Sequence, residues 1–227
     1  MKIQHVFFDL DHTLWDFEKN SDLTFQKIFL KQNININLKE FLAIYKPLNL
    51  KYWKLYREEK ISKKELRYSR LKKTFDEMYY AISDDLINIL AVEYINCLPH
   101  FNNLFEHTFE VLEYLKNKYE LHIITNGFEE IQTKKMASSK ILPYFKEVIT
   151  SDSVGVKKPN AKVFQFALKK ANAKAEHSIM IGDSIEADIL GAINVGMKAL
   201  HCNFENKKVA KNNFNSITSL KEIKQYL

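Results

Sequence analysis

The spacing of hydrophobic residues changes twice along the chain. A short apolar strand is predicted at 3–10, and it ends in an acidic cluster. After Thr13, apolar residues recur at helical spacing to about residue 100, and the first glycine of the chain is Gly127. From Phe105 onward, short apolar strands alternate with helical segments. This order predicts an α/β sheet that a helical segment interrupts directly after the first strand.

Two helix starts are marked clearly inside the helical segment. Ser62 is followed three positions later by Glu65, which is the pattern of a capping box, and it predicts a helix through about residue 80. Ser83, which is followed by Asp84 and Asp85, predicts the start of a second helix that runs through Ile95. We therefore interpret this part of the chain as packed helices joined by short connections.

The C-terminal half predicts the remaining strands and helices. Strands are expected at 121–124, 147–150, 178–181 and 198–202, and helices at 105–117, from 129, at 160–171, at 186–194 and at 219–227. Short apolar strands separated by helices are typical of a parallel sheet that is buried on both faces. The predicted fold is a Rossmann-like, doubly wound parallel α/β sheet. Its core comprises residues 1–14 and 101–227, and residues 15–100 form a helical cap domain.

Composition narrows the class of protein. The 227 residues are 46% hydrophobic and 13% aromatic, which excludes a disordered chain. Five glycines and four prolines are too few for a turn-rich β-sandwich, and two cysteines far apart do not form a disulfide framework. The apolar start reaches Asp9 too soon for a signal peptide, and no run approaches the ~20 apolar residues of a membrane span. We expect a cytoplasmic protein with no membrane partner.

The net charge of +6 first suggests a nucleic acid or a phosphorylated ligand as partner. The excess is divided equally between residues 15–100 and the rest of the chain, at +3 each. One window, 51–73, holds ten basic residues against three acidic ones, with aromatic residues between them. Aromatic residues at 52, 53 and 56 suit the core stripe of a helix better than stacking on bases. We expect no nucleic-acid partner; salt-dependent DNA binding would support the nucleic-acid alternative.

Polar residues follow four of the predicted strands. They are Asp9, Asp11 and Thr13; Thr125 and Asn126; Lys157 or Lys158; and Asp183 and Asp188. Because ligands of open α/β sheets bind at the carboxyl ends of the strands, we expect these groups around one crevice. Clustered carboxylates repel one another, and a hard cation such as Mg²⁺ relieves that repulsion. One carboxylate could attack phosphorus and a second could transfer protons, while Thr125 and a lysine hold the phosphoryl oxygens.

Four segments resemble the motifs of the haloacid dehalogenase (HAD) superfamily of hydrolases. They are Asp9-Leu10-Asp11-His12-Thr13, Ile123-Ile124-Thr125-Asn126-Gly127, Lys158-Pro159, and Gly182-Asp183 with Asp188. The resemblance covers essentially the whole chain, and the helical insertion resembles the C1 cap of that superfamily. It implies Asp9 as nucleophile, Asp11 as general acid and base, and Thr125 and Lys158 as phosphate-binding residues. Lys158 is preferred over Lys157 because it directly precedes a proline.

The same resemblance implies a Mg²⁺ cofactor. Its ligands would be the Asp9 side chain, the Asp11 backbone carbonyl and Asp183. Asp188 would act through a water molecule or would support the ligands without contacting the ion.

Finer features resemble the pyrimidine 5′-nucleotidases of HAD subfamily IA. They include Thr125-Asn126-Gly127-Phe128 with Gln132, and Leu66-Arg67 with Arg70. The resemblance implies a small phosphorylated metabolite as substrate, namely a nucleoside monophosphate. Candidate substrate-binding residues are Asn126, Gly127, Trp15, Arg67 and Arg70.

Some of these assignments keep two readings. Trp15 either stacks on a base or seals the hinge, and Arg67 and Arg70 share a helix face that contacts either substrate or solvent. The chain lacks the tryptophan usually found before Asn203, and its polar segment 206–215 has no counterpart in the resemblance.

The superfamily also includes dehalogenases, phosphonatases and phosphomutases. A dehalogenase does not need Asp11, and no cap lysine stands out as the imine-forming residue of a phosphonatase. A phosphomutase, or a phosphatase for sugar phosphates or other small metabolites, stays an alternative. The predicted function is that of a Mg²⁺-dependent phosphatase with an aspartyl-phosphate intermediate that acts on pyrimidine nucleoside 5′-monophosphates.

Overall fold

The structure, a computed structural model, describes residues 2–206 and 213–227. The chain separates into two compact units, one comprising Met1–Glu18 with Asn102–Leu227 and the other comprising Lys19–Phe101. The sequence predicts the first boundary after residue 14, whereas the structure groups residues 15–18 with the sheet. The reason is that the backbone of Trp15 pairs with those of Asp11 and Leu104. Most of the polar segment 206–215 lies outside the described residues.

The first unit contains a parallel sheet, which confirms the predicted fold class. Its six strands in the described residues are β1 (His5–Phe8), β2 (Glu120–Thr125), β3 (Glu147–Thr150), β4 (Ser178–Gly182), β5 (Lys198–Cys202) and β6 (Asn215–Ile217). They lie in the order β3-β2-β1-β4-β5-β6, and every neighbouring pair is parallel. The chain winds outward in both directions from β1, so the carboxyl end of this strand is the topological position where α/β sheets bind ligands.

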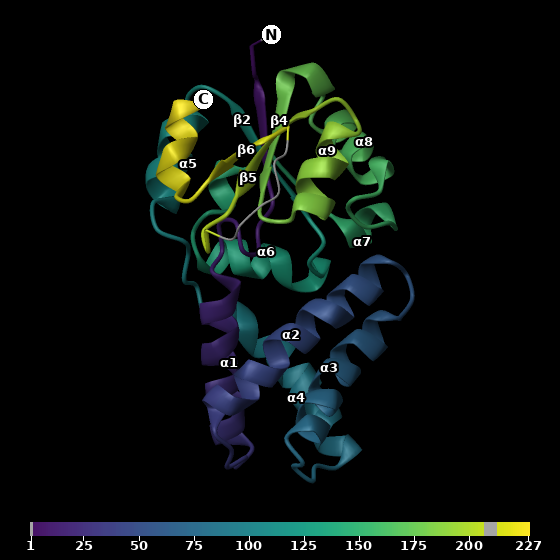
Figure 1. The fold of residues 1–227 in the computed structure, drawn as a ribbon. Coiled ribbons are helices and arrows are strands. Elements are labelled where there is room, and N and C mark those ends of the chain that lie inside the picture. The colour runs from purple at the N-terminus through teal and green to yellow at the C-terminus, as the bar shows by residue number, and fades with distance from the viewer. Residues whose placement is uncertain (1, 207–212) are drawn as a thin grey trace. The chain divides into compact units, whose positions relative to one another are not determined.

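Helices cover both faces of this sheet (Figure 1). On one side lie α5 (Thr108–Lys116) and the 3₁₀-helix η5 (Leu220–Gln225), and on the other lie α8 (Ala161–Lys170) and α9 (Gly191–Ile193). Short elements complete the unit: α6 (Glu129–Ser138), η2 (Leu142–Tyr144), α7 (Ser151–Val154), η3 (Ala175–His177) and the π-helix η4 (Ile185–Leu190). Phe7, Ile124 and Met180 of the sheet form a core cluster with Val163 and Phe164 of α8.

The second unit is helical. Its elements are α1 (Phe17–Lys31), α2 (Leu38–Arg57), α3 (Lys63–Glu77), α4 (Asp84–Cys97) and η1 (Leu98–His100). The capping box of Ser62 and Glu65 is present at the start of α3, and Ser83 caps α4, as the sequence predicts. Its interior is rich in aromatic rings: Phe25 contacts the rings of Phe41, Tyr45 and Tyr94 at centroid distances of 4.9, 4.6 and 4.8 Å.

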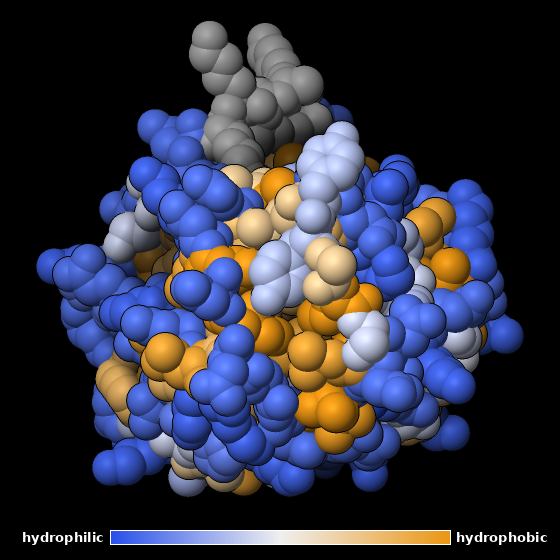
Figure 2. Space-filling view, turned by 90° about the horizontal axis from the view of Figure 1, so that it is seen from below, coloured by the Kyte–Doolittle hydropathy of each residue, from blue (hydrophilic) through white to orange (hydrophobic). Residues whose placement is uncertain are grey.

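On the face seen in Figure 2, hydrophilic side chains surround apolar ones that gather near the centre of the view. In the helical unit the exposed large apolar residues are Leu30, Leu50, Tyr79, Ile89 and Val92. No helix in the described part of the chain has both the length and the apolar character to cross a membrane.

Candidate active site

The centre of the site is a buried ion pair between Asp9 and Lys158. Asp9 directly follows β1, and its backbone N–H donates to the carbonyl of Ile181 (2.9 Å) on the neighbouring strand. The Nζ atom of Lys158 lies 2.6 Å from Oδ1 of Asp9 and 2.7 Å from Oδ1 of Asp188. A third contact of 2.6 Å joins the same Nζ to the carbonyl oxygen of Ile124. Of the two candidate lysines, Lys158 is therefore the one that the structure places beside Asp9.

Burial and charge determine how Asp9 and Lys158 ionise. Burial raises the pKa of Asp9 well above its usual range; Lys158 opposes this shift, and the neighbouring Asp188 and Asp183 add to it. Burial alone would lower the pKa of Lys158, but the carboxylates of Asp188 and Asp9 outweigh that effect, so its pKa is raised. Lys158 therefore stays a cation, which is the form that binds phosphoryl oxygens.

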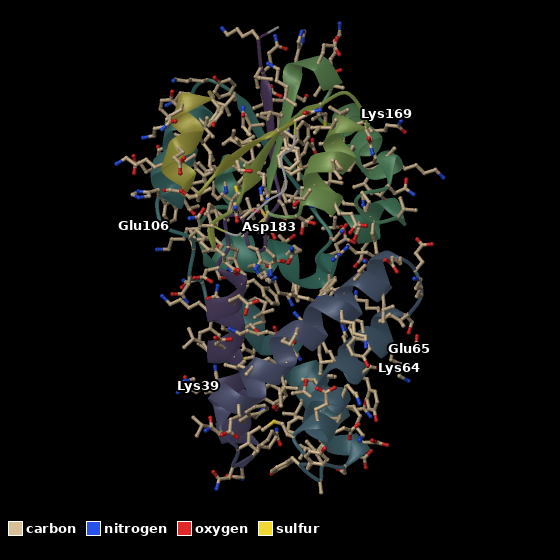
Figure 3. The ribbon with its side chains drawn as sticks, viewed as in Figure 1. Lys39, Lys64, Glu65, Glu106, Lys169 and Asp183 are labelled. Carbon is tan, nitrogen blue, oxygen red and sulfur yellow. The ribbon has the colours of Figure 1, made fainter. Side chains whose placement is uncertain are left out.

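Asp183 and Asp188 reach the same place from β4 and η4. Asp183 follows β4 directly, and Figure 3 shows it in the sheet unit. The N–H of Ser184 donates to Oδ2 of Asp188 (3.0 Å), which fixes this carboxylate against the turn. A Cβ atom on Gly182 would lie 2.3 Å from that same oxygen, so only glycine leaves room for Asp188. Asp188 belongs to the π-helix η4 and faces Lys158. A π-helix has one more residue in each hydrogen-bonded turn than an α-helix, and it is frequent at functional sites.

The carboxylates form a donor set for a hard cation. Asp9, Asp183 and Asp188 each offer an oxygen, and the three atoms lie within 4.8 Å of one another. Burial, and then the charge of Asp188, raise the pKa of Asp183 to about 7. Thr13 donates to Oδ1 of Asp183 at 3.4 Å. An all-oxygen set that holds excess negative charge in a buried place fits Mg²⁺.

Thr125 is positioned as a hydrogen-bond donor at the end of β2. Its Oγ1 accepts from the N–H of Gly127 (3.1 Å) and from Nε2 of Gln132 (2.8 Å). Two donors occupy the oxygen, so the hydroxyl proton stays available for a ligand. A Cβ atom on Gly127 would lie 2.2 Å from Nε2 of Gln132, so Gly127 permits the contact between Gln132 and Thr125.

Asn126 holds the loop of Lys158. Its Nδ2 donates to the carbonyl of Lys158 (3.0 Å), and its Oδ1 accepts from the N–H of Lys158 (2.8 Å). Both ends of the amide are used in this reciprocal pair. The structure therefore gives Asn126 a positioning role, in contrast to the direct contact with substrate that the sequence predicts.

Asp11 is held by two residues of α6. The Nζ atom of Lys135 lies 2.7 Å from Oδ1 and 3.1 Å from Oδ2 of Asp11, and Nε2 of Gln132 donates to Oδ2 at 3.1 Å. The ammonium of Lys135 also lies 4.4 Å from the centroid of the Trp15 ring. Lys135 is not among the site residues predicted from the sequence. Its signal was present, because Gln132 and Lys135 are polar residues three apart on the buried face of α6, beside Ile131 and Met136.

The other predicted substrate contacts have different surroundings. The Trp15 side chain is fully buried, which favours packing over stacking on a ligand. Arg70 is also buried; it donates to Oδ1 of Asn49 (2.9 Å) and lies 4.9 Å from the ring centroid of Tyr94, inside the helical unit. Burial of Arg70 argues against the solvent-facing alternative, because the guanidinium finds its partners in the interior; its contact with substrate stays a prediction. Arg67 is half-buried, and its role stays a prediction.

The sequence profile of the haloacid dehalogenase-like hydrolases matches residues 6–202, a span that runs from β1 to the end of β5. The chain belongs to this family. It is therefore a hydrolase whose motif carboxylates, Thr125 and Lys158 converge at one end of the sheet.

Relatives of known name cover most of the chain. The pyrimidine 5′-nucleotidase YjjG of Escherichia coli is 29% identical, over 100% of this chain and 99% of the relative. The glyceraldehyde 3-phosphate phosphatase of Methanothermobacter thermautotrophicus is 34% identical, over 89% and 87%. The magnesium-bound crystal structure of the HAD-hydrolase YfnB from Bacillus subtilis superposes with a TM-score of 0.89 and 27% identity, over 100% of this chain and 99% of that one.

Proposed function

We propose that this protein is a phosphatase that hydrolyses nucleoside 5′-monophosphates, with pyrimidine nucleotides preferred. The observation that carries the proposal is that two carboxylates, two residues apart, have different partners, which suits them to different roles. Asp9 is paired with Lys158 in a buried position, and Asp11 is held separately by Lys135 and Gln132. The nucleotidase YjjG, aligned over the whole chain, supports the choice of substrate.

Asp9 is the proposed nucleophile. Its carboxylate oxygen attacks the phosphorus atom, the bond between phosphorus and the ester oxygen breaks, and an aspartyl-phosphate forms. Asp11 gives a proton to the leaving oxygen, and the nucleoside departs as an alcohol. The Nζ atom of Lys158 and the hydroxyl of Thr125 donate hydrogen bonds to the phosphoryl oxygens as their charge shifts.

Hydrolysis of the aspartyl-phosphate completes the reaction. Asp11 now accepts a proton from water, whose oxygen attacks phosphorus, and the bond to Asp9 breaks to release inorganic phosphate. Lys135 and Gln132 keep the Asp11 carboxylate in one orientation for both proton transfers, because each contacts it directly.

A Mg²⁺ ion fits the carboxylates of this site. Asp9 and Asp183 would hold it, with Asp188 and the backbone carbonyl of Asp11 completing the protein's share of the ligands. When bound, it supplies positive charge that offsets the repulsion between the carboxylates and the incoming phosphate. The magnesium-bound structure of YfnB supports this assignment.

The test is a phosphate-release screen with Mg²⁺ across nucleoside 5′-monophosphates and sugar phosphates, glyceraldehyde 3-phosphate included. The proposal expects the highest kcat/KM with a pyrimidine nucleotide. A higher value for glyceraldehyde 3-phosphate would overturn the nucleotide assignment and keep the phosphatase. Release from no phosphomonoester would overturn both.

The mechanism has its own test. Asp9→Asn is nearly isosteric and should abolish turnover while the protein stays folded. Turnover that persists in Asp9→Asn would remove Asp9 as nucleophile.

A further inference from the structure

A second group of metal-binding side chains lies at the opposite end of the sheet from Asp9. His5 is the first residue of β1, Glu120 is the first residue of β2, and His122 follows two residues later. His5 and Glu120 are partners in the parallel register, so the three side chains project from the same face of the sheet. Each offers one ligand atom, and these atoms lie within 4.8 Å of one another.

The distances within this group match the edges of a tetrahedral coordination shell. Nδ1 of His5 lies 3.2 Å from Nε2 of His122 and 3.4 Å from Oε2 of Glu120. Ligands about 2.0–2.1 Å from a tetrahedral Zn²⁺ ion are separated by about 3.3–3.4 Å. Two of the three edges therefore suit a single ion, and the atoms of the third pair, His122 and Glu120, lie within 4.8 Å of each other.

His122 has few polar partners for a fully buried imidazole. His122 is fully buried, its ring stacks on Phe7, and its Nδ1 has no hydrogen-bond partner among the described residues. Its Nε2 lies 3.2 Å from Nδ1 of His5. An ion bound at Nε2 would replace His5 as the partner of that nitrogen, and the neutral ring would carry its proton on Nδ1.

Glu120 provides both charge and access. It is exposed, so an ion and a water molecule can reach the group from solvent. Lys146 contacts Oε1 of Glu120 at 2.8 Å, which leaves Oε2, the oxygen nearest to His5, for the ion. Two imidazoles and one carboxylate select Zn²⁺ over Mg²⁺, because hard cations prefer oxygen ligands.

We propose that His5, His122 and Glu120 form a Zn²⁺ site that stabilises the amino-terminal edge of the sheet. A fourth position is left to water. The site lies apart from the carboxylates at the other end of β1, and it does not depend on which phosphomonoester the protein hydrolyses.

The test uses the full chain, stripped of metal and returned to excess Mg²⁺, which occupies the Asp9 carboxylates. Co²⁺ is then titrated as a spectroscopic probe, and Zn²⁺ binding is measured by calorimetry. The site predicts one equivalent of tetrahedral Co²⁺ that Zn²⁺ displaces. It also predicts a rise in Tm of about 5–10 °C at Zn²⁺ concentrations 100 times Kd.

Three substitutions test the ligands. Glu120→Gln alters an exposed residue, so it tests the site without risk to folding, and His122→Gln tests the buried ligand. Each should weaken Zn²⁺ binding about tenfold or more. Glu113→Gln is the matched control, since it changes an exposed glutamate of α5 that pairs with Lys116 as Glu120 pairs with Lys146, and it should leave Zn²⁺ binding unchanged.

Three results would overturn the proposal. The first is no saturable Zn²⁺ or Co²⁺ binding in the presence of Mg²⁺, which would mean that His5 and His122 only share a hydrogen bond. The second is wild-type affinity in both Glu120→Gln and His122→Gln. The third is loss of the Zn²⁺ equivalent in Asp183→Asn, which would place the ion among the catalytic carboxylates.

Discussion

The affinity for Mg²⁺ should fall steeply as the pH falls below 7. The site holds four carboxylates, those of Asp9, Asp11, Asp183 and Asp188, and two ammonium groups, those of Lys135 and Lys158. With all six groups ionised the net charge is −2. Burial, with the repulsion of neighbouring carboxylates added to it, raises the pKa values of Asp9 and Asp183, so protons compensate part of this charge without a metal. A Mg²⁺ ion must therefore displace protons to bind.

The size of the effect follows from Asp183. Burial and Asp188 raise its pKa to about 7, so a proton is bound in most molecules at pH 5.5 and in few at pH 8. One displaced proton weakens Mg²⁺ binding about 30-fold between pH 8 and pH 5.5, or about 2 kcal/mol. Because the pKa of Asp9 is raised too, a second proton makes the dependence steeper.

The stability of the metal-free protein should change with pH in the direction opposite to Mg²⁺ affinity. The pKa of Asp183 is higher in the folded chain than in the unfolded chain, where it is near 4. The folded state therefore binds the proton more tightly. Its stabilising contribution is complete below about pH 4 and is lost as the pH rises through 7, at up to about 1.4 kcal/mol per pH unit. Saturating Mg²⁺ should flatten this slope.

Isothermal titration calorimetry measures both quantities. Titrations at pH 5.5, 6.5 and 8 in buffers of different ionisation enthalpy give the Mg²⁺ affinity and the number of protons released. We expect about one proton or more near pH 6 and fewer at pH 8. Asp183→Asn should lose the proton that belongs to this residue. An affinity that changes less than about threefold across this range would refute the reasoning.

Three further predictions test the parts around the nucleophile. Lys135→Met should lower kcat about 10- to 100-fold with little change in KM, measured by phosphate release, because Asp11 loses the group that orients it. Gly182→Ala should lower kcat about 100-fold in the same assay, since its Cβ would meet Asp188 at 2.3 Å and displace it. Arg70→Met should leave KM unchanged and destabilise the protein by about 2 kcal/mol in denaturant unfolding, because Arg70 is buried with its partners; a raised KM with unchanged stability would return Arg70 to the substrate site.

Local signals in the sequence were sufficient for most of the fold. The strands at 147–150 and 198–202 have the predicted bounds, because each is a short apolar run between turn residues. β6 was missed because it has three residues and no apolar alternation. The helix predicted at 186–194 begins as a π-helix, since the spacing of apolar residues alone does not distinguish the 3.6 residues per turn of an α-helix from a slightly wider turn.

The chemistry at the strand ends was easier to predict than the residues that support it. Thr125 follows the apolar run of its strand, and Lys158 directly precedes a proline, so local sequence identifies both residues. The supporting contacts depend on pairs far apart, such as Lys135 with Asp11, 124 residues away, and Asn126 with Lys158, 32 residues away. A single sequence contains no signal for such pairs, because these residues come together only when the parallel strands align their carboxyl ends.

The two ends of β1 carry different donor atoms, and this difference makes the two proposed metal sites separable. Three carboxylates lie at the carboxyl end, whereas two imidazoles and one carboxylate lie near the amino end. Mg²⁺ binds oxygen and does not compete well for imidazole, while Zn²⁺ accepts both kinds of ligand. Zn²⁺ added alone would therefore report a mixture of both sites. With Mg²⁺ held in excess, we expect the proposed carboxylate site to hold Mg²⁺, so that the Zn²⁺ that still binds measures the contribution of His5 and His122.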